Sequence, residues 1–234
     1  MIQFFISGTS SGIGKALAEK ALAEGHKVTG ISRRHVIDHE NYHHLSYDLA
    51  NMDSYLKMNF NRNRQAELLV LVNNAGWLGE VKPVAQVSPD SFKRAYEINL
   101  LAPSVLSKMF VEQTQTTGQK RMVINISSGA GAYPVPSWSS YCASKAGIDL
   151  FTRVLQADHP DVQCCAIAPG IVDTEMQGEI RRVEGKYFPD KQRFVDYKNQ
   201  GDLSRPSDVA QKIYHFIEHP EEIPDVVFSL RDVS

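Results

Sequence analysis

The chain has 234 residues, 42% of them hydrophobic, and a formal net charge of -2. This length allows one well-buried α/β core and is short for two independent domains. The near-neutral charge argues against a nucleic-acid partner, and no apolar run approaches the roughly 20 residues of a membrane span. Because the first residues also lack the basic segment of a signal peptide, we expect a cytoplasmic protein with no membrane partner.

Short apolar runs alternate with helical patterns along the chain, which is typical of βαβ units and of a parallel sheet covered on both faces. The predicted strands are residues 2–7, 27–32, 44–47, 68–73, 121–127, 162–168 and 225–229. The predicted helices are residues 13–24, 52–61, 88–100, 103–116, 138–158 and 207–218, with Ser88 and Ser207 as N-caps. The sequence therefore predicts a Rossmann-type α/β fold, a doubly wound seven-stranded parallel sheet in a three-layer α/β/α single domain.

Residues 174–205 are the one long irregular segment. They contain two possible helical pieces, many charges and three glycines. A long insertion after a sheet strand is often a functional lid. We expect this segment to be a flap that covers the substrate.

A glycine-rich turn joins the first predicted strand to the first predicted helix. Glycines let the backbone turn sharply and approach a ligand, and free N–H groups at a helix start attract pyrophosphate. The same turn can also serve plain strand-to-helix packing. We favour a dinucleotide site, whose residues here are Gly8, Ser10, Ser11, Gly12, Ile13 and Gly14.

Two arginines follow the second predicted strand. An NAD-selective site usually places a carboxylate there for the ribose hydroxyls, but this chain has Arg33 and Arg34. Guanidinium groups bind phosphate with planar, bidentate geometry, so this pair suits the 2′-phosphate of NADP(H). A solvated arginine pair is the alternative. Arg33 is the better candidate of the two.

Tyr141 lies four residues before Lys145, about one helical turn, so the two side chains share a helix face. A free phenol, with a pKa of about 10, is a poor acid at neutral pH, and a nearby cation lowers that pKa. The pair therefore predicts a tuned proton donor.

Over almost its whole length the chain resembles the short-chain dehydrogenase/reductase family. The matching motifs are GTSSGIG at the first turn, Asp48-Leu49, Asn73-Asn74-Ala75-Gly76, Asn99, Ser128, Tyr141 with Lys145, and Pro169-Gly170 with Val172 and Thr174. By this resemblance Asp48 and Leu49 lie at the adenine, and Asn74, Ala75 and Gly76 lie around the adenosine ribose. The segment from Pro169 through Val172 to Thr174 is expected to hold the nicotinamide carboxamide.

The resemblance also implies the chemistry. Carbonyl reduction builds negative charge on an oxygen, which needs a hydrogen-bond donor and a proton. Ser128 is expected to polarise that oxygen and Tyr141 to supply the proton, while Lys145 tunes the phenol and holds the nicotinamide ribose. Asn99 is expected to carry a water that links Lys145 to solvent. The interval of thirteen residues to Tyr141 favours Ser128 over its neighbour Ser127.

Finer matches, NNAGWLGEV and YCASKAG with IAPGIVDTEMQ, resemble the sepiapterin reductase and benzil reductase branch. Val227 is the approximate counterpart of the acidic residue that anchors pterin in sepiapterin reductases, which favours an apolar diketone. The resemblance therefore implies an NADPH-dependent carbonyl reductase of small ketones or 1,2-dicarbonyls, working as a homodimer. The alternative is an NADP(H)-sensing protein without turnover; an extended epimerase needs a further substrate domain, for which the chain has no room.

Other residues have plainer interpretations. The histidines at 35, 39, 43 and 44 lack a ligand-spaced pair, so we expect a solvated loop there and no metal site. Adjacent Cys164 and Cys165 are expected in the core. The large apolar residues expected to line a substrate pocket are Trp77, Tyr133, Trp138, Met176 and Phe188.

Overall fold

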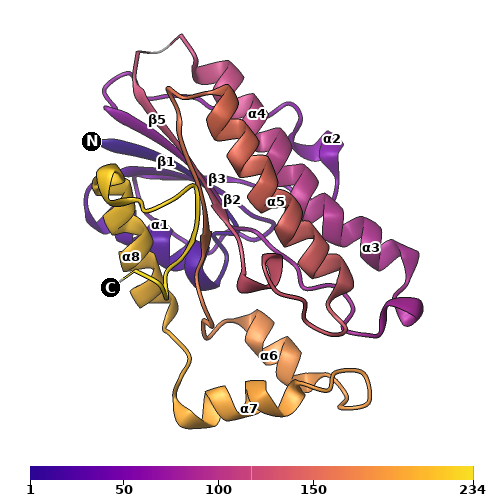
Figure 1. Ribbon diagram of the computed structural model, residues 1–234. Coiled ribbons are helices and arrows are strands. Elements are labelled where there is room, and N and C mark those ends of the chain that lie inside the picture. The colour runs from indigo at the N-terminus through magenta and orange to yellow at the C-terminus, as the bar shows by residue number, and fades with distance from the viewer. Residues whose placement is uncertain (117, 234) are drawn as a thin grey trace.

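The computed structural model describes residues 1–116 and 118–233. Seven strands form one sheet in the order β3-β2-β1-β4-β5-β6-β7, and every pairing is parallel (Figure 1). The strands are β1 (Ile2–Ser7), β2 (Lys27–Ile31), β3 (Tyr42–Leu45), β4 (Leu68–Asn73), β5 (Lys120–Ile126), β6 (Gln163–Ala168) and β7 (Val227–Ser229). This is the doubly wound sheet that the sequence predicts, and its order reverses between β1 and β4.

Helices cover both faces of this sheet (Figure 1). They are α1 (Gly12–Ala23), α2 (Met52–Tyr55), α3 (Pro89–Tyr96), α4 (Ala102–Thr114), α5 (Ser139–Asp158), α6 (Glu175–Arg182), α7 (Lys191–Gln200) and α8 (Pro206–Glu218). The shorter turns are η1 (Val84–Gln86), the π-helical η2 (Glu97–Leu101), η3 (Gly129–Gly131) and η4 (Pro220–Glu222). Within the described residues, none of the helices has the length and apolar character that crossing a bilayer requires.

Successive side chains of each strand point to opposite faces of the sheet, which divides the core into two layers. Phe4 packs with Leu17 of α1 and Ile213 of α8, whereas the next residue, Phe5, packs with Phe110 of α4. All five side chains are buried. Because successive strand residues point to opposite faces, one apolar strand supplies both layers, and burying each such side chain contributes roughly 1.5–3 kcal/mol.

Cys164 and Cys165 follow the same alternation. Both are fully buried, Cys164 in the layer of α4 and Cys165 in the layer of α1 and α8. The prediction that the pair packs in the core is confirmed.

Element boundaries differ from the prediction where long-range contacts decide them. Strand β3 begins two residues early because Tyr42 pairs with Val28 of β2. Helix α2 stops at Tyr55 instead of continuing to residue 61, and the following Phe60 is buried, its N–H donating to Gln113 Oε1 at 2.9 Å. These contacts form only in the folded chain, so local patterning does not contain them.

Of the two predicted N-caps, one is confirmed. The N–H of Ser91 donates to Ser88 Oγ at 3.2 Å at the start of α3. The prediction for Ser207 is wrong, because α8 starts one residue earlier with Pro206 in its first turn and Arg205 as N-cap. Proline suits the first helical position, where its missing N–H costs nothing.

The two helices predicted at residues 88–100 and 103–116 are one helical run interrupted by η2. The backbone stays right-handed helical at Tyr96 and Leu101, on either side of the π turn. Pro103 has no N–H for the carbonyl of Asn99 four residues earlier, which favours a wider turn at this point. Such π turns often occur at functional sites, and this one carries Asn99.

Residues 174–205 form α6 and α7 and lie beyond the carboxyl edge of the sheet (Figure 1). The two ends of the segment are joined at its base: the N–H of Ser204 donates to the Ile171 carbonyl at 3.0 Å, and the N–H of Asp173 donates to the Ser204 carbonyl at 2.9 Å. The segment therefore leaves and rejoins the sheet at one place.

Candidate active site

A cleft of about 800 Å³ opens at the carboxyl ends of the strands. This is the edge at which open α/β sheets bind ligands. The sequence-predicted residues that line it are Gly8, Ser10, Ser11, Gly12, Ile13, Arg33, Arg34, Asp48, Leu49, Asn74, Ala75, Gly76, Ser128, Tyr141, Lys145, Pro169, Gly170, Val172 and Thr174. The two predicted site residues outside this lining are Gly14 and Asn99.

The glycine turn has no room for side chains. Gly8 has φ +76°, and a Cβ there would lie 2.7 Å from Asn74 Nδ2. Gly12 has φ +57°, and its Cβ would lie 3.2 Å from Thr174 Cγ2. A Cβ on Gly14 would collide with the Asn74 side chain and the Gly8 carbonyl, so Gly14 serves close packing behind the turn. The turn is thus built for close approach of backbone to a ligand.

The start of α1 adds the donors that a pyrophosphate needs. The Ser11 side chain caps no N–H of the helix, and its first turn holds no acidic residue. The helix dipole therefore faces the cleft with its N–H groups available. Arg34 makes only a long, exposed ion pair with Glu175 at 4.0 Å, and among the described residues Arg33 makes none. The donor set fits a phosphorylated dinucleotide.

Tyr141 and Lys145 lie on the buried face of α5, and their side chains lie close together. The Lys145 Nζ lies 5.7 Å from the centre of the Tyr141 ring and donates to the Ile126 carbonyl at 2.7 Å. Ser128, in the turn that follows β5, lies close enough for its side chain to lower the Tyr141 pKa. The structure therefore brings Ser128, Tyr141 and Lys145 together at one wall of the cleft.

Burial governs the acidity of both groups. It raises the pKa of Tyr141 to about 12, against the smaller lowering effect of the Ser128 side chain. It lowers the pKa of Lys145 from 10.5 to about 8, and the nearby Asp149 opposes that shift. The prediction that Lys145 brings the Tyr141 pKa below its usual value is therefore wrong for this structure. Desolvation of the phenolate is the largest cause of the shift, and the Lys145 ammonium donates to a backbone carbonyl instead of to the phenol.

Asn99 is buried beneath the cleft and its amide holds a loop. The N–H of Trp77 donates to Asn99 Oδ1 at 2.8 Å, and Asn99 Nδ2 donates to the Trp77 carbonyl at 2.8 Å and to Ser144 Oγ at 3.1 Å. A Cβ on Gly76 would lie 3.7 Å from Asn99 Oδ1 and 3.9 Å from Lys145 Nζ, so both groups face the same point. The expected role of Asn99 in a proton path stays a prediction.

Aromatic side chains form the other end of the cleft. Trp138 meets Tyr141 edge-on, with ring centres 5.7 Å apart, and lies 5.5 Å from Phe194. Of the expected pocket residues, Trp77, Tyr133, Trp138 and Met176 line the cleft. Phe188 does not, because it is fully buried behind Trp138 at 5.6 Å.

Several cleft residues were missed from the sequence. Phe194 and Tyr197 line the cleft from α7, three residues apart, and their spacing in the predicted flap would have placed both on one helix face. Ser32 is predicted from the sequence only as the last residue of a strand. It is buried beside the two arginines and also lines the cleft.

The histidine-rich stretch is more ordered than the solvated loop that was expected. His35 and His44 stack with ring centres 4.8 Å apart and an interplanar angle of 5°, and both stack on Tyr42. The ordering comes from β3, which the sequence analysis placed two residues too late.

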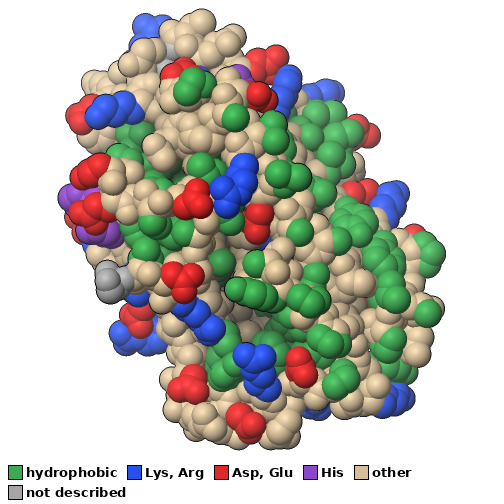
Figure 2. Space-filling model, in the orientation of Figure 1, with side chains coloured by type: hydrophobic (Ala, Val, Ile, Leu, Met, Phe, Trp, Pro, Cys, Tyr) green, Lys and Arg blue, Asp and Glu red, His purple; other side chains and the backbone are tan. Residues whose placement is uncertain are grey.

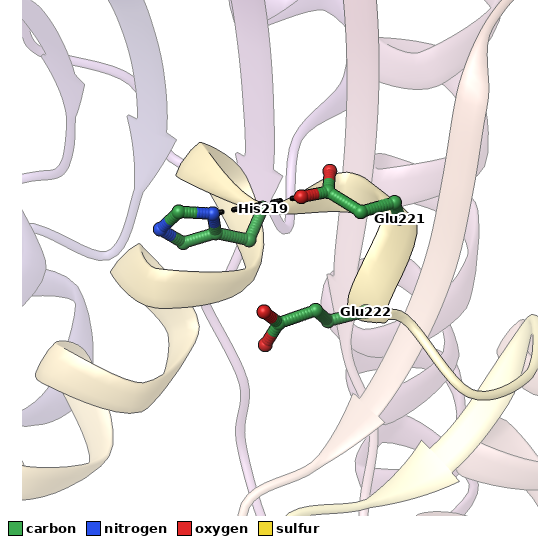
Figure 3. A group of neighbouring side chains, drawn as sticks. All are labelled: His219, Glu221 and Glu222. Carbon is green, nitrogen blue, oxygen red and sulfur yellow. Dashed lines mark ion pairs between the residues drawn. The ribbon is translucent and has the colours of Figure 1, made fainter.

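A separate group of possible metal-binding side chains lies at the end of α8 (Figure 3). His219 Nδ1 lies 3.6 Å from Glu221 Oε1, and Glu222 pairs with His215 at 2.7 Å. All are exposed and none lines the cleft. Ordinary surface ion pairs account for this group.

Known proteins of one enzyme family are similar to this chain in sequence and in structure. A family model described as short chain dehydrogenase matches residues 3–185. A benzil reductase ((S)-benzoin forming) of Bacillus subtilis is 34% identical over 230 residues, which cover 94% of this chain and 94% of the relative. A sepiapterin reductase of Meriones unguiculatus is 33% identical over 154 residues, covering 64% of this chain and 58% of that protein. A short-chain dehydrogenase/reductase from Saccharomyces cerevisiae superposes with a TM-score of 0.86 at 26% identity, covering 98% of this chain and 96% of that structure.

Proposed function

The chain belongs to the short-chain dehydrogenase family, and we propose that it is an NADPH-dependent reductase of small ketones and 1,2-dicarbonyls. Membership makes it an oxidoreductase that acts on C=O or CH–OH groups. One observation carries the proposal: Ser128, Tyr141 and Lys145 share a single cleft with the glycine turn after β1.

When bound, NADPH supplies the hydride of this reaction. The hydroxyl groups of Ser128 and Tyr141 bind the substrate oxygen, on which negative charge grows. Tyr141 gives that oxygen its proton, a step for which a positioned general acid contributes about 10²–10⁴-fold. Lys145 lies close enough to stabilise the phenolate left behind, and the Ile126 carbonyl fixes its ammonium.

The preference for NADPH rests on the loop after β2. Arg33 and Arg34 are exposed, line the cleft and leave their guanidinium groups accessible to a phosphate. Of the acidic residues in the cleft lining, Glu175 lies 4.0 Å from Arg34 in an exposed pair, and Asp48 Oδ1 accepts the N–H of Ala50 at 3.1 Å. The two arginine cations favour a 2′-phosphate over a free ribose hydroxyl, and Asp48 already accepts a backbone N–H.

An apolar aryl ketone or dicarbonyl is the proposed substrate. Trp138 meets the Tyr141 ring edge-on and packs against Phe194, and aromatic pairs gain about 0.5–1.5 kcal/mol beyond simple burial. Val227 stands where a pterin-binding relative is expected to have an acid. The similarity to benzil reductase over nearly the whole chain supports the same class of substrate.

A carbonyl panel run with NADPH and with NADH tests the proposal. Benzil, phenylpropanedione, a pterin, a quinone and simple aldehydes should be compared by the rate of cofactor oxidation. Faster turnover of the aryl diones with NADPH is expected. Tight NADPH binding without turnover of any carbonyl would instead favour the alternative, a protein that senses NADP(H).

Two further features belong to this proposal. Residues 174–205 are the proposed substrate flap, because α6 and α7 line the aromatic end of the cleft and their segment leaves and rejoins the sheet at one place. We also propose a homodimer formed by α4 and α5, and a cytoplasmic location, which the three free thiols suit.

A further inference from the structure

The loop that carries Arg33 and Arg34 is fixed to strand β3 on both sides. Ser32 precedes the two arginines and His35 follows them, and each of these flanking residues contacts the side chain of His44 in β3. The arginines themselves are exposed and have no such support. Their placement therefore depends on the two flanking contacts.

The contact before the arginines is a small hydrogen-bond network. His44 Nε2 lies 3.0 Å from the Ser32 carbonyl, which can only accept, so Nε2 carries the proton and donates. Ser32 Oγ in turn donates to the Arg34 carbonyl at 2.8 Å, which closes the turn containing Arg33. Burial lowers the pKa of His44, and the hydrogen bond to the Ser32 carbonyl opposes that shift.

The contact after the arginines is a ring stack. His35 lies parallel to His44 at 4.8 Å and also stacks on Tyr42 at 5.9 Å. Tyr42 reaches the glycine turn as well, because its hydroxyl is 2.9 Å from Thr9 Oγ1. The histidine and tyrosine rings of this edge therefore connect the arginine loop with the turn after β1.

We propose that His44 and His35 are positioning residues for the 2′-phosphate of the dinucleotide, holding the backbone of Arg33 and Arg34 so that their guanidinium groups point at it. This inference rests on the proposed preference for NADPH. It predicts that disturbing either histidine weakens the binding of the phosphorylated dinucleotide selectively, although neither lines the cleft.

The test is equilibrium binding of NADPH and of NADH, measured by calorimetry on the purified full chain. His44→Phe keeps a ring for stacking and removes the donor, whereas His44→Gln keeps a donor near the position of Nε2 and removes the ring. His35→Ala removes the other half of the stack. His43→Ala is the matched control, since His43 is the exposed neighbour on the other face of β3.

We expect His44→Phe and His35→Ala each to weaken NADPH binding by about three- to tenfold, while the affinity for NADH changes by less than about twofold, the range that one lost hydrogen bond or stack allows. His44→Gln should fall between these variants and the wild type, and His43→Ala should match the wild type. Adenosine 2′,5′-bisphosphate should lose affinity in the same variants, and adenosine 5′-monophosphate should not.

Equal losses for both dinucleotides would overturn the inference, because they would mean general damage to the site. Unchanged selectivity in His35→Ala and His44→Gln, the two gentler variants, would overturn it as well, even if His44→Phe failed to fold. A wild-type protein that binds NADPH no better than NADH would refute the proposed cofactor preference and this inference together. A wild-type preference that survives all the variants would refute the inference alone.

Discussion

At the scale of single residues, burial is the main influence on the proposed chemistry. Tyr141 and Lys145 are 7% and 4% exposed. Desolvation favours the uncharged form of each side chain, so it raises the pKa of Tyr141 and lowers the pKa of Lys145. A phenol held protonated is ready to give its proton to an alkoxide, which is a stronger base than phenolate. The neighbouring ammonium then matters most after the proton has left, when it stabilises the new negative charge.

This balance predicts the pH dependence of reduction. Because burial lowers the pKa of Lys145 to about 8, its ammonium prevails below pH 8 and is lost as the pH rises through that value. Tyr141, with a pKa of about 12, stays protonated over the same range. We expect kcat/KM for reduction to fall above about pH 8, approaching tenfold per pH unit for a single ionisation. Initial rates between pH 6 and pH 10 measure it.

Lys145→Arg provides the comparison for that profile. An arginine stays charged throughout the range, so any activity the variant keeps should show no decline near pH 8. A wild-type rate that stays level to pH 10 would contradict the proposed role of the ammonium.

At the scale of elements, the glycine turn and the π turn place the functional groups. The turn after β1 opens the start of α1 toward the cleft, and η2 carries the Asn99 amide that holds the backbone of Trp77. Both elements depart from regular structure at the point where they meet the site. Such departures are expected where a backbone must approach a ligand.

A matched pair of glycine variants tests the first of these elements. Gly8 and Gly25 have nearly equal φ angles, +76° and +77°, but a Cβ on Gly25 meets nothing within 4 Å, whereas a Cβ on Gly8 collides with Asn74. Both alanine variants incur the backbone strain, which is of order 1 kcal/mol for a left-handed residue. We expect Gly8→Ala to be less stable than Gly25→Ala by urea denaturation and to lose NADPH binding by more than about tenfold.

Gly25→Ala should bind NADPH like the wild type. Equal stabilities for the two variants, with NADPH binding intact in both, would show that the space beside Gly8 is not needed.

At the scale of the whole molecule, the sheet order brings distant segments to one cleft, and the outer helices leave an apolar surface. Hydrophobic side chains gather over the face on which α3, α4 and α5 lie (Figure 2). Leu150 and Val154 of α5 are 65% and 50% exposed, one helical turn apart, and Leu101 beside α4 is 40% exposed. An exposed apolar stripe on two adjacent helices suits a two-fold interface.

The proposed homodimer gives a prediction at this scale. Replacing Leu150 and Val154 together by glutamate buries like charges against each other in a two-fold interface, so the protein should elute as a monomer in size-exclusion chromatography with light scattering. Val84→Glu is the control, because Val84 is 63% exposed on η1, outside these helices. A wild-type monomer, or a double variant that remains dimeric, would contradict the proposal.

The sheet was predictable because each buried strand is a short apolar run and each turn at its carboxyl end has a distinctive composition. The same locality explains why Ser128, Tyr141 and Lys145 lie in one cleft, since each follows or faces such a strand end. The pKa of Tyr141 was not predictable, because burial depends on Trp138 and the flap, far along the chain.

The boundaries of β3 and α2 could not be predicted either, since long-range pairing and the burial of Phe60 determine them. The order around His35 and His44 was missed for the same reason. Contacts of His44 with Ser32, which follows β2, order this polar stretch beside the arginines that line the cleft.

The central claim is that Tyr141 protonates a carbonyl oxygen during reduction by NADPH. The most direct measurement is the turnover of benzil by Tyr141→Phe, with NADPH affinity measured on the same sample. The ring of the variant keeps the edge-on contact with Trp138 and loses only the hydroxyl, so we expect NADPH affinity within about threefold of wild type and kcat lower by about 10²-fold or more. Wild-type turnover in a variant that binds NADPH normally would contradict the account.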